Sequence, residues 1–340
     1  MQKYNWQTIG QEKNSQFLQK NLVNEKLAHA YLFVGKEHLG KGQLAKEFIK
    51  TILCQDYHQQ NQIEAEMFPC NQCVFCQQLD KGIHPDVYFL KREEDKKNIS
   101  VEQVREMQKI LYLASFLNSY KIALIEQAGD LNESAQNALL KILEEPRKKT
   151  ILILIVHDLN VLLPTIISRC RVVKFQPVAT EIIFQHLLKL GANREEARIF
   201  SALSHGQIGL ALTFFNNPDY YKVYLEKAKQ FCELFGQNLT TKFKIIENSL
   251  ADFETPLAKI EYLNQELGDW QIFLRDLLLL QNNLNHLITN RHFQVELQKL
   301  AGKFSSKNII LLLKKIEKIK LILLNNINPR LAVENLILSF

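Results

Sequence analysis

The stretch "YLFVGKEHLGKGQLAKEF", from Tyr31 to Phe48, decides how the first half of this chain is interpreted. An apolar run leads through glycines into a helix-forming segment, which is the order of elements in a P-loop. Gly35, Gly40 and Lys41 match the nucleotide signature G-x-x-x-x-G-K-[ST]. Gly42 then stands where that signature has a hydroxyl for Mg²⁺. We predict a degenerate P-loop; the alternative is an ordinary corner between a strand and a helix.

Composition places the chain among cytoplasmic globular proteins. Its 340 residues, 46% of them apolar, can bury a large core, and the length favours about two or three domains. The N-terminal "MQKYNWQTIGQEK" has no apolar signal region, and no apolar run is long enough to span a membrane. The net charge of +6 permits a polyanionic partner without requiring one.

Five short runs in the first half have the apolar, β-branched character of strands buried on both faces of a parallel sheet. They are residues 31–35, 87–90, 122–126, 151–156 and 172–175. Helical patterns lie between them at 41–54, 100–116 and 132–146. Ser100 is the N-cap candidate of the second helix, and Pro146 ends the third. This alternation predicts an α/β fold with a parallel sheet.

The rest of the chain has a helical pattern. Short helices are expected near 180–190, 194–204 and 207–215, and a further helical region continues to the end. The segment "LLLKKIEKIKLILL" (311–324) has leucines and isoleucines on one face and lysines on another, which is typical of a helix with one solvated side. Residues 58–66 are expected to form a polar loop.

Four of the six cysteines form a pattern typical of a metal site. Cys54, Cys70, Cys73 and Cys76 have the spacing C-x15-C-x2-C-x2-C, and four thiolates suit a closed, structural Zn²⁺ site. A chain without an export signal is not expected to use them as disulfides. An iron–sulfur cluster is a weaker alternative because the x3-C-P of the ferredoxin run is missing, and free core cysteines are another. His84 in "IHPDV" is expected to be a turn residue rather than a ligand.

The segment "KIALIEQAGDL" lacks the carboxylates of a working ATPase. Such a site needs an Asp for Mg²⁺ and a carboxylate that acts on water, whereas this segment offers Glu126 and Gln127. Gln127 cannot accept a proton, and the Glu126 carboxylate extends one methylene further than that of an Asp. Together with Gly42, these residues predict a chain that does not hydrolyse ATP.

Several segments, in order, resemble one protein family. They are "HAYLFVG", "GKG", the cysteine insertion ending in "HPDV", "YKIALIEQAGDLNESAQNALLKILEEP" and "LLPTIISRCRVVKF". Over residues 1 to about 215 the chain resembles the clamp-loader AAA+ subunits of bacterial DNA polymerase III. Its eroded nucleotide motifs look like the delta-prime branch of that family rather than the ATP-hydrolysing gamma/tau branch.

The resemblance implies a domain organisation and a set of partners. The implied parts are a RecA-like AAA+ core at 1–176 with a zinc module at about 54–84, a helical lid at 177–216, and an all-helical collar at 217–340 through which subunits form an open ring. The implied partners are the gamma/tau and delta subunits, the sliding clamp and, through the complex, primed DNA. The chain would then serve DNA replication as a subunit of the DNA-directed DNA polymerase III holoenzyme.

The resemblance also assigns roles to single residues. The family motif "SRC", Ser168 to Cys170, carries an arginine finger, and that role falls on Arg169. The alternative for Arg169 is a surface ion pair. In "SHGQIGLAL", Gly209 stands where ATPase members have a nucleotide-sensing Arg. Because Lys41 survives, ATP binding is expected to be weak or absent.

Two alternative functions stay open at this point. One is an active gamma/tau-like clamp-loader ATPase, against which Gly42, Gln127 and Gly209 argue. The other is a stand-alone, zinc-bearing nucleic-acid binder without ring partners.

Overall fold

The structure is a computed structural model that describes residues 4–58, 67–93, 96–116, 119–234, 237–251, 253–323 and 328–338. Apart from His58, the predicted polar loop at 58–66 lies outside these residues. The chain divides into two compact units, Met1–Leu212 and Thr213–Phe340.

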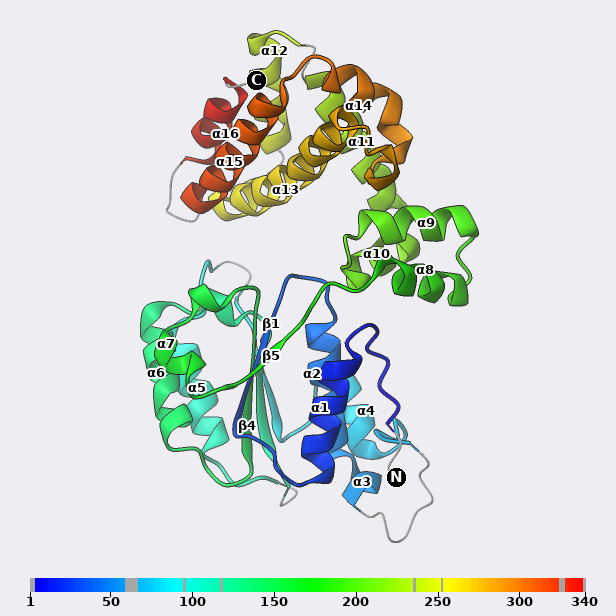
Figure 1. Cartoon of the computed structure of the whole chain (residues 1–340). Coiled ribbons are helices and arrows are strands. Elements are labelled where there is room, and N and C mark those ends of the chain that lie inside the picture. The colour runs from blue at the N-terminus through cyan, green and yellow to red at the C-terminus, as the bar shows by residue number, and fades with distance from the viewer. Residues whose placement is uncertain are drawn as a thin grey trace. The chain divides into compact units, whose positions relative to one another are not determined.

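A five-stranded parallel sheet forms the centre of the first unit (Figure 1). Its strands are β1 (Ala30–Val34), β2 (Val87–Leu90), β3 (Lys121–Ile125), β4 (Thr150–Val156) and β5 (Arg171–Lys174). They are arranged in the order β2-β3-β4-β1-β5, and each pair of neighbours is parallel. The bounds of each strand differ from the prediction by at most one residue, so the predicted strands are confirmed.

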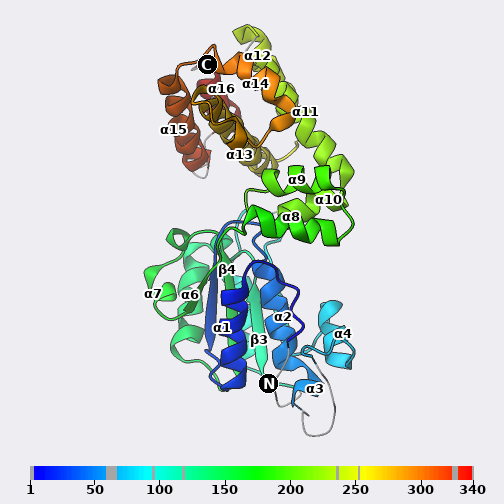
Figure 2. The same cartoon turned by 45° about the vertical axis from the view of Figure 1, so that its right-hand side comes forward.

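Helices cover both faces of this sheet (Figures 1 and 2). Those with the largest share in the two cores are α1 (Glu12–Val23), α2 (Lys41–Leu53), α5 (Val101–Leu111) and α6 (Glu133–Glu144). Successive side chains of a strand point to opposite faces, so Leu32 packs in one core with α5 and α6 while Phe33 packs in the other with α1 and α2. Both faces are therefore apolar, as the unbroken hydrophobic runs predict.

Local capping fixes where helices α5 and α6 begin. The Ser100 and Gln103 side chains each bond to the other's backbone N–H, which makes a capping box at the start of α5. Asn132 caps α6 by accepting from the Ala135 N–H. Helix α5 ends at Leu111, earlier than the predicted 116, because the buried Asp86 carboxylate accepts a hydrogen bond from the Phe116 N–H at 2.9 Å and draws the chain away from the helix axis.

The first unit contains further short helices. They are α3 (Gln55–His58), α4 (Val74–Asp80), α7 (Pro164–Ile167), α8 (Thr180–Lys189), α9 (Arg194–Leu203) and α10 (Ile208–Asn216), with 3-10 turns η1 (Ala128–Asp130) and η2 (Leu159–Val161). Helix α10 begins in this unit and ends in the second. The three helices predicted between 180 and 215 correspond to α8, α9 and α10.

The second unit is helical throughout its described residues. It contains α11 (Pro218–Leu234), α12 (Leu239–Ala251), α13 (Pro256–Gln281), η3 (Asn285–Leu287), η4 (Arg291–Phe293), α14 (Gln294–Ala301), α15 (Ser306–Leu323) and α16 (Pro329–Ile337). Phe231 and Phe273 pack in its core with ring centroids 4.8 Å apart. No helix in the described parts of the chain is long and apolar enough to cross a membrane. The predicted fold class, a parallel α/β core followed by helices, is confirmed.

Candidate nucleotide, metal and arginine sites

Two glycines shape the loop between β1 and α2. Gly40 has a φ of 85° and stands at the N-cap of α2, where an L side chain is strained. Gly35 has a φ of 152°, and a Cβ there would lie 2.8 Å from the Phe175 carbonyl oxygen. The loop follows the carboxyl end of a parallel strand, which is where α/β proteins bind ligands. The backbone of a phosphate-binding corner is therefore retained.

The Lys41 side chain is turned into the loop that would hold a phosphate. Its Nζ donates hydrogen bonds to the Gly35 carbonyl oxygen at 2.5 Å and to the Lys36 carbonyl oxygen. Lys41 is only 6% exposed, and this burial lowers its pKa to about 8, although the Glu37 carboxylate acts in the opposite direction. The cation is thus engaged by its own loop and has lost part of its tendency to stay charged.

The Glu126 carboxylate, which follows β3, is paired with two lysines. Its oxygens lie 3.1 Å from Lys46 Nζ of α2 and 3.8 Å from Lys91 Nζ after β2. A Mg²⁺ ion at this carboxylate would have to compete with both cations. Gln127 comes next at the start of η1 and brings no charge. The arrangement therefore fits a site without a catalytic metal.

Gly209 packs directly on the loop between β1 and α2. Its N–H donates to the His38 carbonyl oxygen at 2.8 Å, and a Cβ at 209 would meet His38 atoms at 3.2 to 3.3 Å. Such contacts are tighter than ordinary van der Waals distances, so a long side chain at 209 would require the loop to move. The glycine that replaces the sensing Arg thus has a packing role here.

Gly42 is different, because no atom lies within 4 Å of a Cβ built there. We predict that Gly42→Ser folds normally and gains about 0.5 kcal/mol in unfolding free energy, since serine is the better helix former. We also predict that the restored hydroxyl gives no ATP hydrolysis, because Glu126 and Gln127 are unchanged. Thermal denaturation and a steady-state ATPase assay check the two parts. Turnover in the serine variant would show that the hydroxyl alone was missing.

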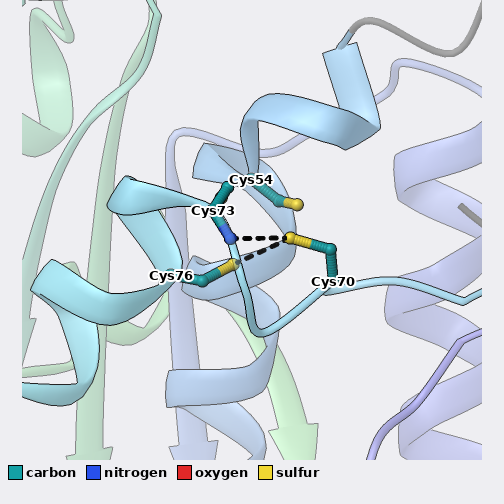
Figure 3. Close-up of side chains that lie close together, drawn as sticks. All are labelled: Cys54, Cys70, Cys73 and Cys76. Carbon is teal, nitrogen blue, oxygen red and sulfur yellow. Dashed lines mark hydrogen bonds between the residues drawn. The ribbon is translucent and has the colours of Figure 1, made fainter. Parts of the chain in front are cut away.

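The four predicted cysteines come together beside the first helix of the P-loop corner (Figure 3). Cys54 ends α2, Cys70 lies in a loop, and Cys73 and Cys76 lie at the start of α4. The four sulfur atoms all lie within 4.8 Å of one another. The Cys73 N–H donates to Cys70 Sγ at 3.3 Å, the kind of support that orients a metal ligand.

The dimensions of this cluster fit a tetrahedral metal site. Zn–S bonds of about 2.3 Å place tetrahedral sulfur atoms about 3.8 Å apart, and Cys70 Sγ and Cys76 Sγ are 3.8 Å apart. The contact with Cys76 lowers the pKa of Cys54 to about 5, whereas burial raises the pKa of Cys70 to about 12. Crowded thiols cannot all ionise without a cation, and a divalent metal supplies that charge. The cluster can therefore hold a metal ion such as zinc.

His84 is not among the grouped metal-ligand side chains of the described residues. It is 2% exposed, and its Nδ1 accepts from the Asp86 N–H at 3.1 Å just before β2. Burial lowers the pKa of His84, which keeps the ring neutral. Its contacts are those of a residue that shapes a turn.

Arg169 lies between α7 and β5 with its side chain 36% exposed. Its Nη2 is 2.9 Å from Glu144 Oε1 at the end of α6, and its Nη1 donates to the Thr165 carbonyl oxygen at 3.1 Å. Arg171 points elsewhere, with its guanidinium 5.0 Å from the ring centroid of Phe17. The two neighbouring arginines therefore have different surroundings.

Sequence reasoning missed the side chains that support these sites. Lys46 and Lys91 neutralise Glu126, and Glu144 contacts Arg169. A signal was present for Glu144, because an acidic residue at a helix C-terminus opposes the helix dipole and so calls for a nearby cation. Nothing local marked the two lysines, since both meet Glu126 only through the fold.

The fold and its loops define an α/β protein with a P-loop corner that lacks its metal ligands. The family model described as "DNA polymerase III, delta subunit" matches residues 10–179, half of the chain, and the chain belongs to this family. The delta' subunit of DNA polymerase III from Bacillus subtilis is 28% identical over 96% of this chain and 95% of its own length. The delta' subunit from Pseudomonas aeruginosa is 43% identical over 42% of each. Among solved structures, a gamma subunit-related protein from Thermotoga maritima covers 97% of both chains at 15% identity, with a TM-score of 0.44.

Proposed function

We propose that the chain is a delta-prime-type subunit of the bacterial DNA polymerase III clamp loader, which assembles with gamma/tau and delta subunits and does not itself hydrolyse ATP. The family membership and the nearly full-length similarity to a delta' subunit support this role. Through the complex, the chain would help to place the sliding clamp on primed DNA.

The retained but disarmed P-loop supports the absence of hydrolysis. Lys41 is bonded to its own loop, and Glu126 is paired with lysines. A hydroxyl ligand is missing at Gly42, and Gly209 brings no cation. Hydrolysis needs a metal, a positioned water and a stabilised phosphoryl group at once. Each departure removes one of these parts, and the loop is left as a scaffold.

The position of Arg169 is the observation that carries the second half of the proposal, an action on a neighbour. Arg171 pairs with Tyr31 in the sheet, so Arg169 precedes the start of β5, whereas Gly35 follows the end of β1. At about 3.3 Å per residue, Tyr31 and Gly35 are about 13 Å apart along the strand. Arg169 therefore lies beyond the reach of its own P-loop, and a phosphate that it contacts belongs to another chain.

A guanidinium suits this role. It is planar and permanently charged, and it can neutralise the negative charge that develops on a γ-phosphoryl group. We therefore assign to Arg169 the part of an arginine finger in trans. The cysteine cluster is proposed to hold a structural Zn²⁺ that braces residues 54–84. The core at 1–176, the lid at 177–216 and the oligomerising collar at 217–340 remain our proposed division of the chain.

Two assays on the purified chain test this function. We expect it to co-elute with gamma/tau and delta subunits in size-exclusion chromatography, and to show no ATP turnover alone. Failure to co-elute would favour a stand-alone zinc-bearing nucleic-acid binder. Turnover near 1 s⁻¹ by the isolated chain, the low end typical of enzymes, would favour an active ATPase.

A further inference from the structure

We propose that Glu144 is a positioning residue for Arg169, one that sets the orientation in which the guanidinium meets the neighbouring subunit's ATP. The proposal rests on the proposed function, and it adds a residue to which no role in that function has been given. Glu144 would touch no nucleotide and would act only through Arg169.

The contacts of Arg169 hold it from two sides. Glu144 Oε1 lies 2.9 Å from Nη2, while Nη1 donates to the Thr165 carbonyl oxygen at 3.1 Å and to Ser168 Oγ at 3.4 Å. A guanidinium has five N–H donors. These contacts use three of them, so the remaining donors on Nε and Nη2 are left for a phosphoryl group.

Glu144 stands where an isolated helix would not favour it. It is the last residue of α6, at the negative end of the helix dipole, and Glu145 follows it at the C-cap. Among the ion pairs of the described residues, Glu144 pairs with Arg169. The cation therefore offsets an unfavourable placement, which is consistent with a carboxylate kept for its partner.

A second link makes α6 a fixed platform for the segment that carries Arg169. The buried Gln136 of α6 donates to the Val161 carbonyl oxygen at 3.0 Å and accepts from the Leu163 N–H at 2.8 Å. Leu163 is the N-cap of α7. The backbone before α7 and the side chain after it are therefore both anchored to one helix, so Glu144 holds Arg169 against a support that does not move independently.

The expected effect follows from the freedom of the arginine side chain. Without Glu144 the long side chain samples more rotamers, and the fraction in the competent orientation falls. Exposed ion pairs contribute modestly, so we expect a loss of about threefold in hydrolysis at the neighbouring site. Glu144→Gln keeps the size and removes the charge. Glu145→Gln is the matched control, because it removes the adjacent charge from the same helix end.

The test measures single-turnover ATP hydrolysis by the clamp loader reassembled with each variant. The rate of the Arg169→Ala complex measures the sites that Arg169 does not serve, and it is subtracted. We expect Glu144→Gln to be about threefold slow, with Glu144→Asp faster than Glu144→Gln and Glu145→Gln normal. In the Arg169→Ala background, Glu144→Gln should have no further effect, which a merely structural role would not produce.

The outcomes separate the two proposals. If Arg169→Ala slows hydrolysis but Glu144→Gln does not, the positioning role is wrong and the arginine finger stands. A faster Glu144→Gln complex would mean that Glu144 restrains Arg169, and an equal slowing in the Arg169→Ala background would mean that it acts elsewhere; either result overturns the inference. Normal hydrolysis with Arg169→Ala would overturn the finger itself, whatever Glu144 does.

Discussion

Replacing Arg169 with alanine is expected to slow ATP hydrolysis at the neighbouring site by on the order of 10³-fold, because arginine fingers contribute at least this much to phosphoryl transfer. The side chain is half-exposed and makes one surface ion pair, so its loss should leave the unit folded. Assembly with the partner subunits should also be unchanged. Clamp loading should slow together with hydrolysis.

Two matched variants sharpen this prediction. Arg169→Lys keeps the charge and loses the planar fork, so it should recover only a small part of the rate. Arg171→Ala removes a neighbouring charge that lies against Phe17 and should hydrolyse ATP at the normal rate. Equal losses from Arg169→Ala and Arg171→Ala would point to general electrostatics rather than to a finger.

Cys76→Ser is expected to abolish stoichiometric zinc binding and to unfold the zinc module. The apolar core beside the cluster is small, with Cys54, Phe68 and Cys76 as its buried members. A core of this size cannot offset the entropy of ordering the segment, whereas structural zinc contributes on the order of 10 kcal/mol in small domains. Elemental analysis should find one zinc per wild-type chain, and chelation should lower the unfolding temperature.

The remaining cysteines provide the control for the metal. Cys232 lies in α11 of the second unit, so Cys232→Ser should keep its zinc and its response to chelators. Less than about half an equivalent of zinc in wild-type protein purified without chelators would contradict a structural zinc site. A normal zinc content in Cys76→Ser would show that Cys76 is not a ligand.

Features set by neighbouring residues were predictable from the sequence. The strands follow from unbroken apolar runs, which a sheet covered on both faces requires. The starts of α5 and α6 follow from the N-caps Ser100 and Asn132. The cysteine cluster was predictable for a similar reason, because three of its members lie within one short segment and tetrahedral metal binding restricts their spacing.

Features set by distant residues were not predictable. The end of α5 depends on Asp86, which lies before β2, and the state of Glu126 depends on Lys46 and Lys91. The inward turn of Lys41 is also invisible in a motif, since the same lysine in the same signature can face a phosphate. Sequence therefore identified the residues of the disarmed site, and only the fold showed how their charges are used.

The most direct test compares two complexes of partner subunits, one with the wild-type chain and one with Arg169→Ala. Each is isolated by size exclusion, and assembly and single-turnover ATP hydrolysis are measured on the same sample. Our account predicts equal assembly, with hydrolysis at the neighbouring site lower by on the order of 10³-fold in the variant. Equal hydrolysis rates at equal assembly would contradict the claim that this chain acts on its neighbour's ATP.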